Sequence, residues 1–285
     1  MTRYFFVVEL NVRNEQRYLK EFVAYYLVQG ADHIYIYDNE SDIPVNTILG
    51  PALSKYCTIT PFPGRAIKFT AMQHWAKNFG AQCEWVAMID CDELIQPLLP
   101  NTTIRQFLTA QAEDVGGIAI NWVLFGDNQR RTPITTQELT IETFVARQAG
   151  INPHVKTIHR PRCVLPNFYR HPHCVPLRTG RYIDAAGNPH TGGPFNRTTW
   201  TESSKIMRVN HYWWRSEEEW KLKLNTIRDD TGKTRGGVLT PWITWMETDN
   251  CNAVVDTSCS DEWATKVRSF LLLNNEKETA AKQNK

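Results

Sequence analysis

Short apolar runs alternate with amphipathic segments along the first 125 residues. Residues 4–10 (YFFVVEL) and 33–38 (HIYIYD) are rich in aromatic and β-branched side chains, which is typical of buried strands. Between them, apolar residues recur at helical spacing; Asn14 can cap the start of this helix and Gly30 suits a left-handed stop. The pattern therefore predicts a strand, a helix and a second strand.

The same alternation continues along the chain. It predicts helices at residues 44–54, 67–79 and 103–112, and strands at 57–62, 84–90 and 117–124. Strands that alternate with helices indicate a mostly parallel sheet covered on both faces. Ligands of such sheets bind where the carboxyl ends of the strands open onto loops.

The pattern changes after residue 125. Residues 184–200 (DAAGNPHTGGPFNRTTW) have no periodicity and predict a long loop of the kind that closes over ligands. A strand at 205–214 (KIMRVNHYWW) and an amphipathic helix at 216–227 (SEEEWKLKLNTI), which its first serine can cap, come next. We expect residues 274–285 to form a disordered polar tail.

Composition narrows the class of protein. The hydrophobic fraction of 42% in 285 residues suits a globular protein, and 32 Lys and Arg against 30 Asp and Glu give a net charge of +2. This balance gives no reason to expect nucleic acid as a partner. No apolar stretch reaches the roughly 20 residues of a membrane helix, so no transmembrane segment is predicted. Seven scattered cysteines without a CxxC pair are typical of reduced thiols, so we expect a bacterial, viral or host cytoplasm.

An acidic cluster follows directly after a predicted strand in residues 88–95 (MIDCDELI). Asp90 and Asp92 are two residues apart, so in an extended segment their carboxylates face the same side. A divalent cation would remove their repulsion, and hard oxygen ligands suit Mg²⁺ or Mn²⁺. A solvated acidic turn is the alternative, whereas an EF-hand loop is excluded because its sixth position is Ile95 rather than glycine.

Five segments together resemble glycosyltransferases of family 92 and the family 2-like groups, which share the GT-A fold. They are LNVRNEQRYLKEFVAYYLVQGADHIYIYDNES, WVAMIDCDELI, INWVLFG, KTIHRPRCV and VNHYWWRSEEEW, within about residues 4–225. The resemblance implies a single α/β domain, a GT-A-like, Rossmann-like three-layer sandwich with a mostly parallel central sheet. We expect this domain to span residues 1–273, with a nucleotide-sugar-binding half at 1–125 and an acceptor-side half at 126–273.

The resemblance also implies a reaction. A hexosyl or pentosyl group would move from a nucleotide-sugar donor, a UDP-sugar in particular, to a hydroxyl of a glycan acceptor with inversion, assisted by Mn²⁺ or Mg²⁺. Asp90 and Asp92 correspond to the DxD that meets the metal and the diphosphate and ribose of the donor. His211 corresponds to a histidine that completes metal coordination, although a lone histidine in an aromatic strand is also typical of a protein core.

Further residues are candidates for binding the donor. Asp38 matches the acidic residue that grips the nucleoside, and Glu9 and Asn11 would line the same pocket; turn and capping roles are the alternative. Arg65 and Lys156 are candidates for neutralising the diphosphate, although most such residues only solvate a surface.

Inverting transfer also requires a carboxylate that takes the proton of the acceptor hydroxyl. Asp127, after INWVLFG, and Glu142, in IETF, are the two candidates. Glu93 is a third, but its position beside the metal favours an orienting role.

Three other hypotheses remain open. A zinc site could use Cys163, His171, His173 and Cys174, but their spacing matches no usual zinc module; His173 alone is a candidate on the acceptor side. A nucleotidyltransferase would also use paired aspartates and a metal, but no Gly-rich phosphate loop occurs. A non-catalytic sugar-binding or zinc-binding protein would show no donor hydrolysis. Sugars stack on aromatic rings, for which Trp122, Trp213, Trp214, Trp242 and Trp245 are available.

Overall fold

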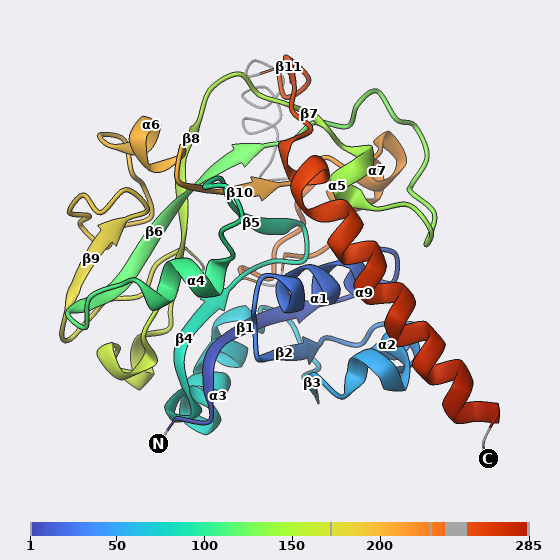
Figure 1. Ribbon diagram of the computed structural model, residues 1–285, viewed down its shortest axis with the longest axis horizontal. Coiled ribbons are helices and arrows are strands. Elements are labelled where there is room, and N and C mark those ends of the chain that lie inside the picture. The colour runs from blue at the N-terminus through green and yellow to red at the C-terminus, as the bar shows by residue number, and fades with distance from the viewer. Residues whose placement is uncertain (1, 172, 229, 237–249, 284–285) are drawn as a thin grey trace.

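A nine-stranded sheet runs through the molecule in the order β3-β2-β1-β4-β8-β6-β10-β5, with β9 paired to β6 (Figure 1). The computed structural model describes residues 2–171, 173–228, 230–236 and 250–283. The strands of this sheet are β1 (Tyr4–Val12), β2 (His33–Asp38), β3 (Cys57–Pro61), β4 (Cys83–Met88), β5 (Glu93–Pro97), β6 (Val115–Leu124), β8 (Asn152–His159), β9 (Arg181–Asp184) and β10 (Met207–His211).

Most of these strands point the same way. β1 pairs in parallel with β2 and β4, β2 with β3, and β6 with β9 and β10. Only β8 and β5 run against their neighbours among the described strands of this sheet. The prediction of a mostly parallel sheet is confirmed, and the carboxyl ends of β1, β4, β6 and β10 lie at one edge.

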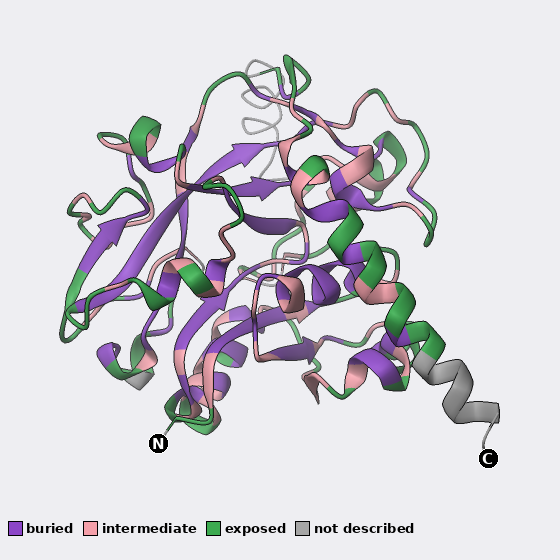
Figure 2. Cartoon of the chain, in the orientation of Figure 1, coloured by how far each residue is buried: buried purple, intermediate pink, exposed green. Residues whose placement is uncertain are grey.

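Helices cover both faces of the sheet. α1 (Leu19–Val28), α2 (Val45–Ser54) and α9 (Ser258–Gln283) lie on one face in Figure 1. α3 (Lys68–Asn78) packs on the other, because Val7 of β1 joins Trp75 of α3 in a second core, whereas Phe6 and Val8 join the core under α1. This alternation is the two-residue period of a strand that is buried on both sides. Figure 2 shows the strands buried along most of their length.

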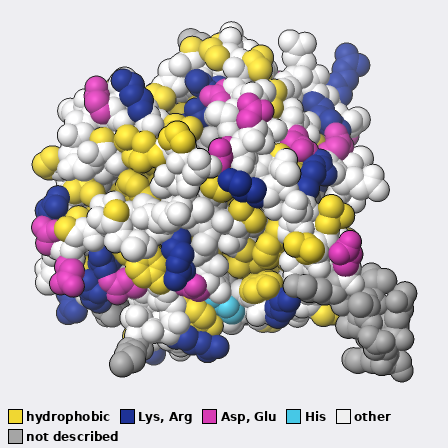
Figure 3. Space-filling model, viewed as in Figure 1, with side chains coloured by type: hydrophobic (Ala, Val, Ile, Leu, Met, Phe, Trp, Pro, Cys, Tyr) yellow, Lys and Arg dark blue, Asp and Glu magenta, His cyan; other side chains and the backbone are white. Residues whose placement is uncertain are grey.

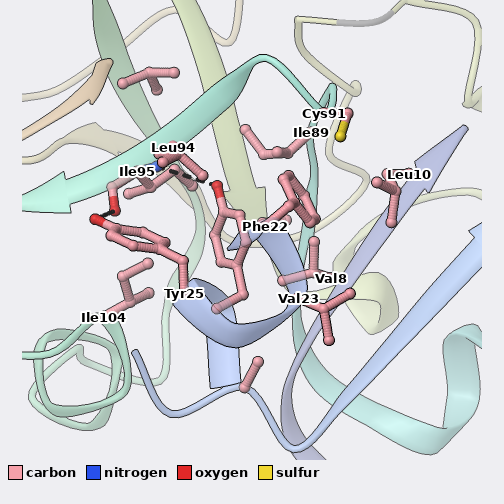
Figure 4. Packing of buried hydrophobic residues seen from close by; sticks show 14 of the residues in the cluster. Val8, Leu10, Phe22, Val23, Tyr25, Ile89, Cys91, Leu94, Ile95 and Ile104 are labelled. Carbon is pink, nitrogen blue, oxygen red and sulfur yellow. Dashed lines mark hydrogen bonds between the residues drawn. The ribbon is translucent and has the colours of Figure 1, made fainter. Parts of the chain in front are cut away.

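α1 anchors the strand that follows the acidic cluster. The Tyr25 hydroxyl donates to the Ile95 carbonyl at 2.9 Å, and the Ile95 amide donates to the Tyr26 hydroxyl at 3.1 Å. Figure 4 shows Tyr25 directed at Ile95, with the Phe22 ring near Ile89 and Val8 in the same packed apolar environment. These contacts fix the start of β5, and with it the acidic cluster.

The remaining elements are short and lie around the sheet. They are α4 (Ile104–Thr109), α5 (Thr140–Thr143), α6 (Trp200–Ser203), α7 (Glu217–Leu224), β7 (Ala146–Arg147) and β11 (Val254–Val255), with 3₁₀ turns at Gly80–Gln82, Pro161–Cys163 and Pro166–Phe168. In the described parts of the chain, no helix combines the length and apolar character that crossing a membrane requires. Figure 3 shows acidic and basic side chains interspersed on the face that it views.

Three local predictions differ from the structure. Asn14 does not cap α1: it has a φ of 60° and its amide donates to Asp42 at 3.1 Å, while Tyr18 takes the cap position. Ser216 does cap α7 through a capping box, but that helix is not amphipathic in its packing, since none of its eight residues, all described, is buried. The tail expected to be disordered continues α9 as far as Gln283, because its Ala, Glu, Lys and Gln residues favour helix.

Candidate active site

A cavity of about 1080 Å³ opens at the carboxyl edge of the sheet. Asn11 at the end of β1, Asp90 and Asp92 after β4, and His211 at the end of β10 all line it. The cavity is large enough for a ligand bigger than most drug-sized molecules, whose pockets span about 300–1,000 Å³. The segment from Trp213 to Arg235, which includes α7, supplies several other lining residues.

The acidic cluster forms a tight turn between β4 and β5. The Glu93 amide donates to the Asp90 carbonyl at 3.0 Å, and the Asp90 amide donates to Oε2 of Glu93 at 2.9 Å. The expectation of an extended segment is therefore wrong. Both side chains still line the same cavity, but each has its own set of cationic partners.

Two lysines hold Asp90. Lys68 at the start of α3 bonds to Oδ1, and Nζ of Lys156 on β8 lies 2.9 Å from Oδ2. Lys156 also lies 2.9 Å from Oε2 of Glu93, and both of these side chains are almost fully buried. Burial opposes the ionisation of Asp90, but Lys156 and Lys68 outweigh it and lower the pKa of its carboxyl. Burial raises the pKa of Glu93, with Lys156 acting against it.

Asp92 has one ammonium and one imidazole beside it. Nζ of Lys223 on α7 donates to Oδ2 at 2.7 Å, and Nε2 of His211 lies 3.6 Å from Oδ1. Burial acts to raise the pKa of Asp92, but Lys223 and His211 together hold it well below its usual range. Asp92 is therefore an anion at neutral pH, with one oxygen turned toward a metal-binding type of side chain.

The donor set fits a divalent cation with two protein ligands. No group of three or more His, Cys, Asp or Glu residues suited to holding a metal occurs within the described residues. Oδ1 of Asp92 and Nε2 of His211 face each other, and both belong to residues that line the cavity. Mg²⁺ characteristically uses one or two carboxylates and fills its other positions with waters and substrate phosphates. Asp90, expected as a further ligand, is engaged by lysines instead.

Contacts across the cavity hold the segment that leads into α7. Nη1 of Arg215 donates to Glu15 at 2.8 Å, and the guanidinium lies 3.5 Å from the ring centroid of Tyr18. The Tyr18 hydroxyl in turn donates to Glu219 of α7. Burial opposes the charge of Arg215, but Glu15 more than compensates and raises its pKa. These contacts attach an otherwise exposed helix to the first loop after β1.

Aromatic rings form another wall. The Trp122 ring stacks on His154 with centroids 5.0 Å apart and contacts His173 at 4.9 Å and His211 at 4.4 Å. Phe195 packs on His154 at 4.6 Å and is 41% exposed. Burial lowers the pKa of His154 to about 4 and that of His173 to about 2, so both rings are neutral at neutral pH. The rings of His154 and His173 thus differ from the charged lysine and arginine side chains that line the cavity from the segment of α7.

The structure brings several predicted donor-binding residues together and leaves others outside. Asn11 and Arg65 line the cavity with the acidic turn. The described lining residues do not include Glu9, which is buried in β1, or Asp38, whose Oδ1 accepts the Ser41 amide at 3.1 Å in a turn. Lys156, 1% exposed, lies behind Asp90 and supports it from within the sheet.

The two candidates for the catalytic base lie elsewhere. Oδ1 of Asp127 accepts from the Gln129 amide and from Asn252, both at 2.8 Å, which is a loop-stabilising role. Glu142 in α5 forms an ion pair with Arg268 of α9. Neither is among the described residues that line the cavity. The carboxylates that line it besides the acidic turn are Glu15, Asp42, Glu219 and Asp230.

The zinc hypothesis has no structural counterpart. Nδ1 of His173 lies 3.0 Å from the Val155 carbonyl, and Cys163 is buried in a 3₁₀ turn. All seven cysteines are free. Of the tryptophans considered for sugar stacking, Trp122, Trp213 and Trp214 line the cavity. Trp242 and Trp245 lie outside the described residues.

No pattern in the sequence pointed to Lys68 or Lys223 as site residues. Their ammonium groups meet carboxylates that are 22 and 131 residues away along the chain. Each lies on a helix whose sequence contains other lysines, and only the folded chain shows which of them turn inward. Arg215 was missed for the same reason, although it follows directly after the aromatic run YWW.

A protein-family model matches the part of the chain that contains this site. The description "Glycosyltransferase family 92" belongs to the model that matches residues 9–231, a range that contains the acidic turn, His211 and Lys223. The chain belongs to glycosyltransferase family 92. Together with the central sheet, this membership confirms the expected GT-A-like α/β fold.

Two curated family 92 proteins are similar to this chain. One, from Oryza sativa subsp. japonica, is 25% identical over 244 residues, which are 84% of this chain and 36% of that protein. The other, from Ricinus communis, is 24% identical over 218 residues, 74% of this chain and 36% of that protein. This family 92 chain thus spans about a third of the length of the curated relatives that it matches.

Solved structures show weaker similarity. S. aureus TarS 1–349 is 13% identical with a TM-score of 0.38, covering 97% of this chain and 82% of that one. Glucosyl-3-phosphoglycerate synthase from Mycobacterium tuberculosis, in complex with Mn²⁺, UDP and phosphoglyceric acid, is 18% identical with a TM-score of 0.28, covering 42% and 43%.

Proposed function

We propose that this family 92 protein is a metal-dependent, inverting glycosyltransferase that moves a hexosyl or pentosyl group from a UDP-sugar to a hydroxyl of a glycan. The observation that carries the proposal is the pairing of Asp92 with His211 in the cavity at the carboxyl edge of the sheet. That edge is where an open α/β sheet presents groups to a nucleotide. The matched family range includes both residues.

The charge of the cavity supports an anionic donor. Arg65, Lys68, Lys223, Arg228 and Arg235 line it and can surround a diphosphate. Asn11 supports the nucleoside end, because its Oδ1 atom is buried and has no hydrogen-bond partner among the described residues. An N–H or hydroxyl group of the nucleoside would satisfy it.

Asp92 and His211 would hold the divalent cation. Bound Mn²⁺ or Mg²⁺ supplies Lewis-acid stabilisation of the leaving diphosphate. Lys156 and Lys68 hold the carboxylate of Asp90 in place, and Glu93 fixes the turn through the Asp90 amide. These contacts preorganise the turn before any ligand arrives.

The aromatic wall supports a saccharide acceptor. Trp122 and Phe195 offer apolar ring faces within the same cavity, and flat sugar faces stack on such rings. For the proton of the acceptor hydroxyl we propose Asp230 in place of Asp127 and Glu142. Asp230 lines the same cavity as the acidic turn; burial acts to raise its pKa, but Arg228 outweighs burial and lowers it. Arg228 donates to its Oδ1 at 2.8 Å and orients it.

The test measures release of nucleotide diphosphate from a panel of nucleotide sugars, with Mn²⁺, Mg²⁺ or EDTA. Asp92→Asn and His211→Ala are expected to lower metal-dependent turnover by about 100-fold, the scale of losing one preorganised electrostatic group. Asp230→Asn should abolish transfer to a glycan while UDP still binds. Asp127→Asn, outside the cavity, is the matched control and should behave like the unmodified protein.

Two outcomes contradict the proposal. Unchanged metal-dependent turnover in both Asp92→Asn and His211→Ala would remove the assigned metal site. A product that keeps the anomeric configuration of the donor, read by NMR, would exclude inversion.

A further inference from the structure

Lys223 is turned inward from α7, a helix in which no residue is fully buried. Its ammonium donates to Oδ2 of Asp92 at 2.7 Å and to the Trp213 carbonyl at 3.1 Å, and lies 3.9 Å from the Trp213 ring centroid. Two residues earlier, Lys221 points outward, pairs with Glu217 and is 67% exposed. α7 thus directs one lysine to the acidic turn and another to solvent.

The carboxylate that Lys223 holds is the one proposed to hold the metal. Lys223 takes one oxygen of Asp92, while the other faces His211 at 3.6 Å. The Asp92 side chain is 14% exposed, so solvent screens its charge only weakly. An ammonium and a divalent cation on the two oxygens of one carboxylate would repel each other strongly in such a place.

We propose that Lys223 is a built-in counter-ion of Asp92, which a divalent cation displaces and which then binds the diphosphate of the donor. The inference rests on the proposed function and names a residue that couples metal binding to donor binding. Before loading, Lys223 neutralises Asp92, which would otherwise be a buried, poorly compensated anion. After displacement, its flexible four-carbon stem keeps the ammonium within the same cavity.

The surroundings suit this exchange. Arg228 and Arg235 follow Lys223 on the same wall and line the cavity with it. The diphosphate of a nucleotide sugar is a dianion and therefore attracts the released ammonium to residues already suited to phosphate. Trp220 packs on Trp214 with ring centroids 4.3 Å apart and Glu219 accepts from Tyr18, so α7 is held in place and the exchange needs only the stem of Lys223 to move.

The test compares Lys223→Met with Lys221→Met by Mn²⁺ titration, read by electron paramagnetic resonance, and by calorimetric titration of UDP. Without nucleotide, Lys223→Met should bind Mn²⁺ several-fold more tightly, because the competing ammonium is gone. At saturating Mn²⁺, the same variant should bind UDP about tenfold more weakly, the size of one charge-assisted contact. Lys221→Met should match the unmodified protein in both titrations. Lys223→Arg, which keeps the positive charge, should bind Mn²⁺ as weakly as the unmodified protein does.

Tighter Mn²⁺ binding together with weaker UDP binding in Lys223→Met distinguishes this role from structural damage, which would weaken both. Suppose that the unmodified protein binds both Mn²⁺ and UDP. If Lys223→Met then binds both more weakly, or binds Mn²⁺ with unchanged affinity, the inference is overturned while the proposed function stands. Absence of Mn²⁺ binding in the unmodified protein and in Lys223→Met overturns the inference and the proposed metal site together.

Discussion

At the scale of single residues, the acidic turn depends on a lysine that no ligand needs to touch. Lys156, 1% exposed, lies between the carboxylates of Asp90 and Glu93, 2.9 Å from each. Burial acts to lower the pKa of the Lys156 ammonium, but Asp90 and Glu93 outweigh it and raise that pKa. The buried Glu93, the partly exposed Asp90 and this lysine form a unit in which each charge depends on the others.

We expect Lys156→Met to lower the free energy of unfolding by about 3 kcal/mol or more, the cost of leaving a buried charge without its partner. Urea denaturation followed by circular dichroism measures the change. Combining Lys156→Met with Glu93→Gln should recover part of the loss, because Asp90 still pairs with Lys68 and the acid that lost its lysine is then neutral. A single variant as stable as the unmodified protein would show that the cluster is not maintained by charge pairing.

What the sequence could reveal at this scale follows from distance along the chain. Asp90, Asp92 and Glu93 are neighbours, so their cluster is visible directly in the sequence. Their cations come from α3, β8 and α7, up to 131 residues away, and pairings of that kind leave no local pattern. Asp127 and Glu142 were misplaced because a carboxylate near a strand end can equally serve a loop or a helix contact.

At the scale of elements, hydrophobic periodicity was informative up to β6. β2 begins and ends where the pattern placed it, and α3 covers nearly the whole of the predicted helix. The pattern failed at α9, whose polar end continues the helix begun at Ser258. A segment of this length would be a marginal helix alone even with favourable residues, but earlier turns that are already formed allow the helix to continue through it.

The start of α9 is tied to two strands by Asp256. Its Oδ2 accepts from Arg147 of β7 and, at 2.9 Å, from Arg208 of β10, while Oδ1 accepts from Ser258. Burial acts to raise the pKa of Asp256, but Arg208 and its other partners lower it. The ionised carboxylate therefore stabilises the fold at neutral pH.

Asp256→Asn should lower the free energy of unfolding at pH 7 by about 2 kcal/mol, in the range for hydrogen bonds to charged groups. Because the pKa is depressed by folding, this contribution is present above the unfolded value of about 4 and disappears as the pH falls through the folded value. Urea titrations from pH 7 to pH 3 should show the difference between variant and unmodified protein shrinking. Asp114→Asn, which removes an exposed pair with Arg181, is the control and should change stability little. A constant difference across this range would contradict the assignment.

At the scale of the whole molecule, the two expected halves are interleaved in one sheet. β4 and β5 are separated by only four residues in sequence, yet β8, β6 and β10 lie between them in the sheet. β5 pairs with β10, from beyond residue 200, and with no other described strand. The acidic turn thus connects β4 to β5, two strands that are separated in the sheet by β8 and β10 from the second half of the chain and by β6.

A fragment of residues 1–125 should therefore fail to fold on its own. It would contain β4, β5 and β6 without β8 and β10, which separate and pair them, so several strand edges would be left open. Amide dispersion in NMR spectra and a urea titration would test this. A cooperative transition in the fragment would show that the first half is autonomous.

The strand order also determines when the sheet can be completed during translation. A nascent chain cannot close the loop around Asp90 and Asp92 until His211 has left the ribosome, because β10 fills the last gap in the sheet. Until then the first strands emerge with an unfinished edge, which invites association with other chains. Chaperone dependence during translation should consequently fall sharply once the tunnel has released that final strand.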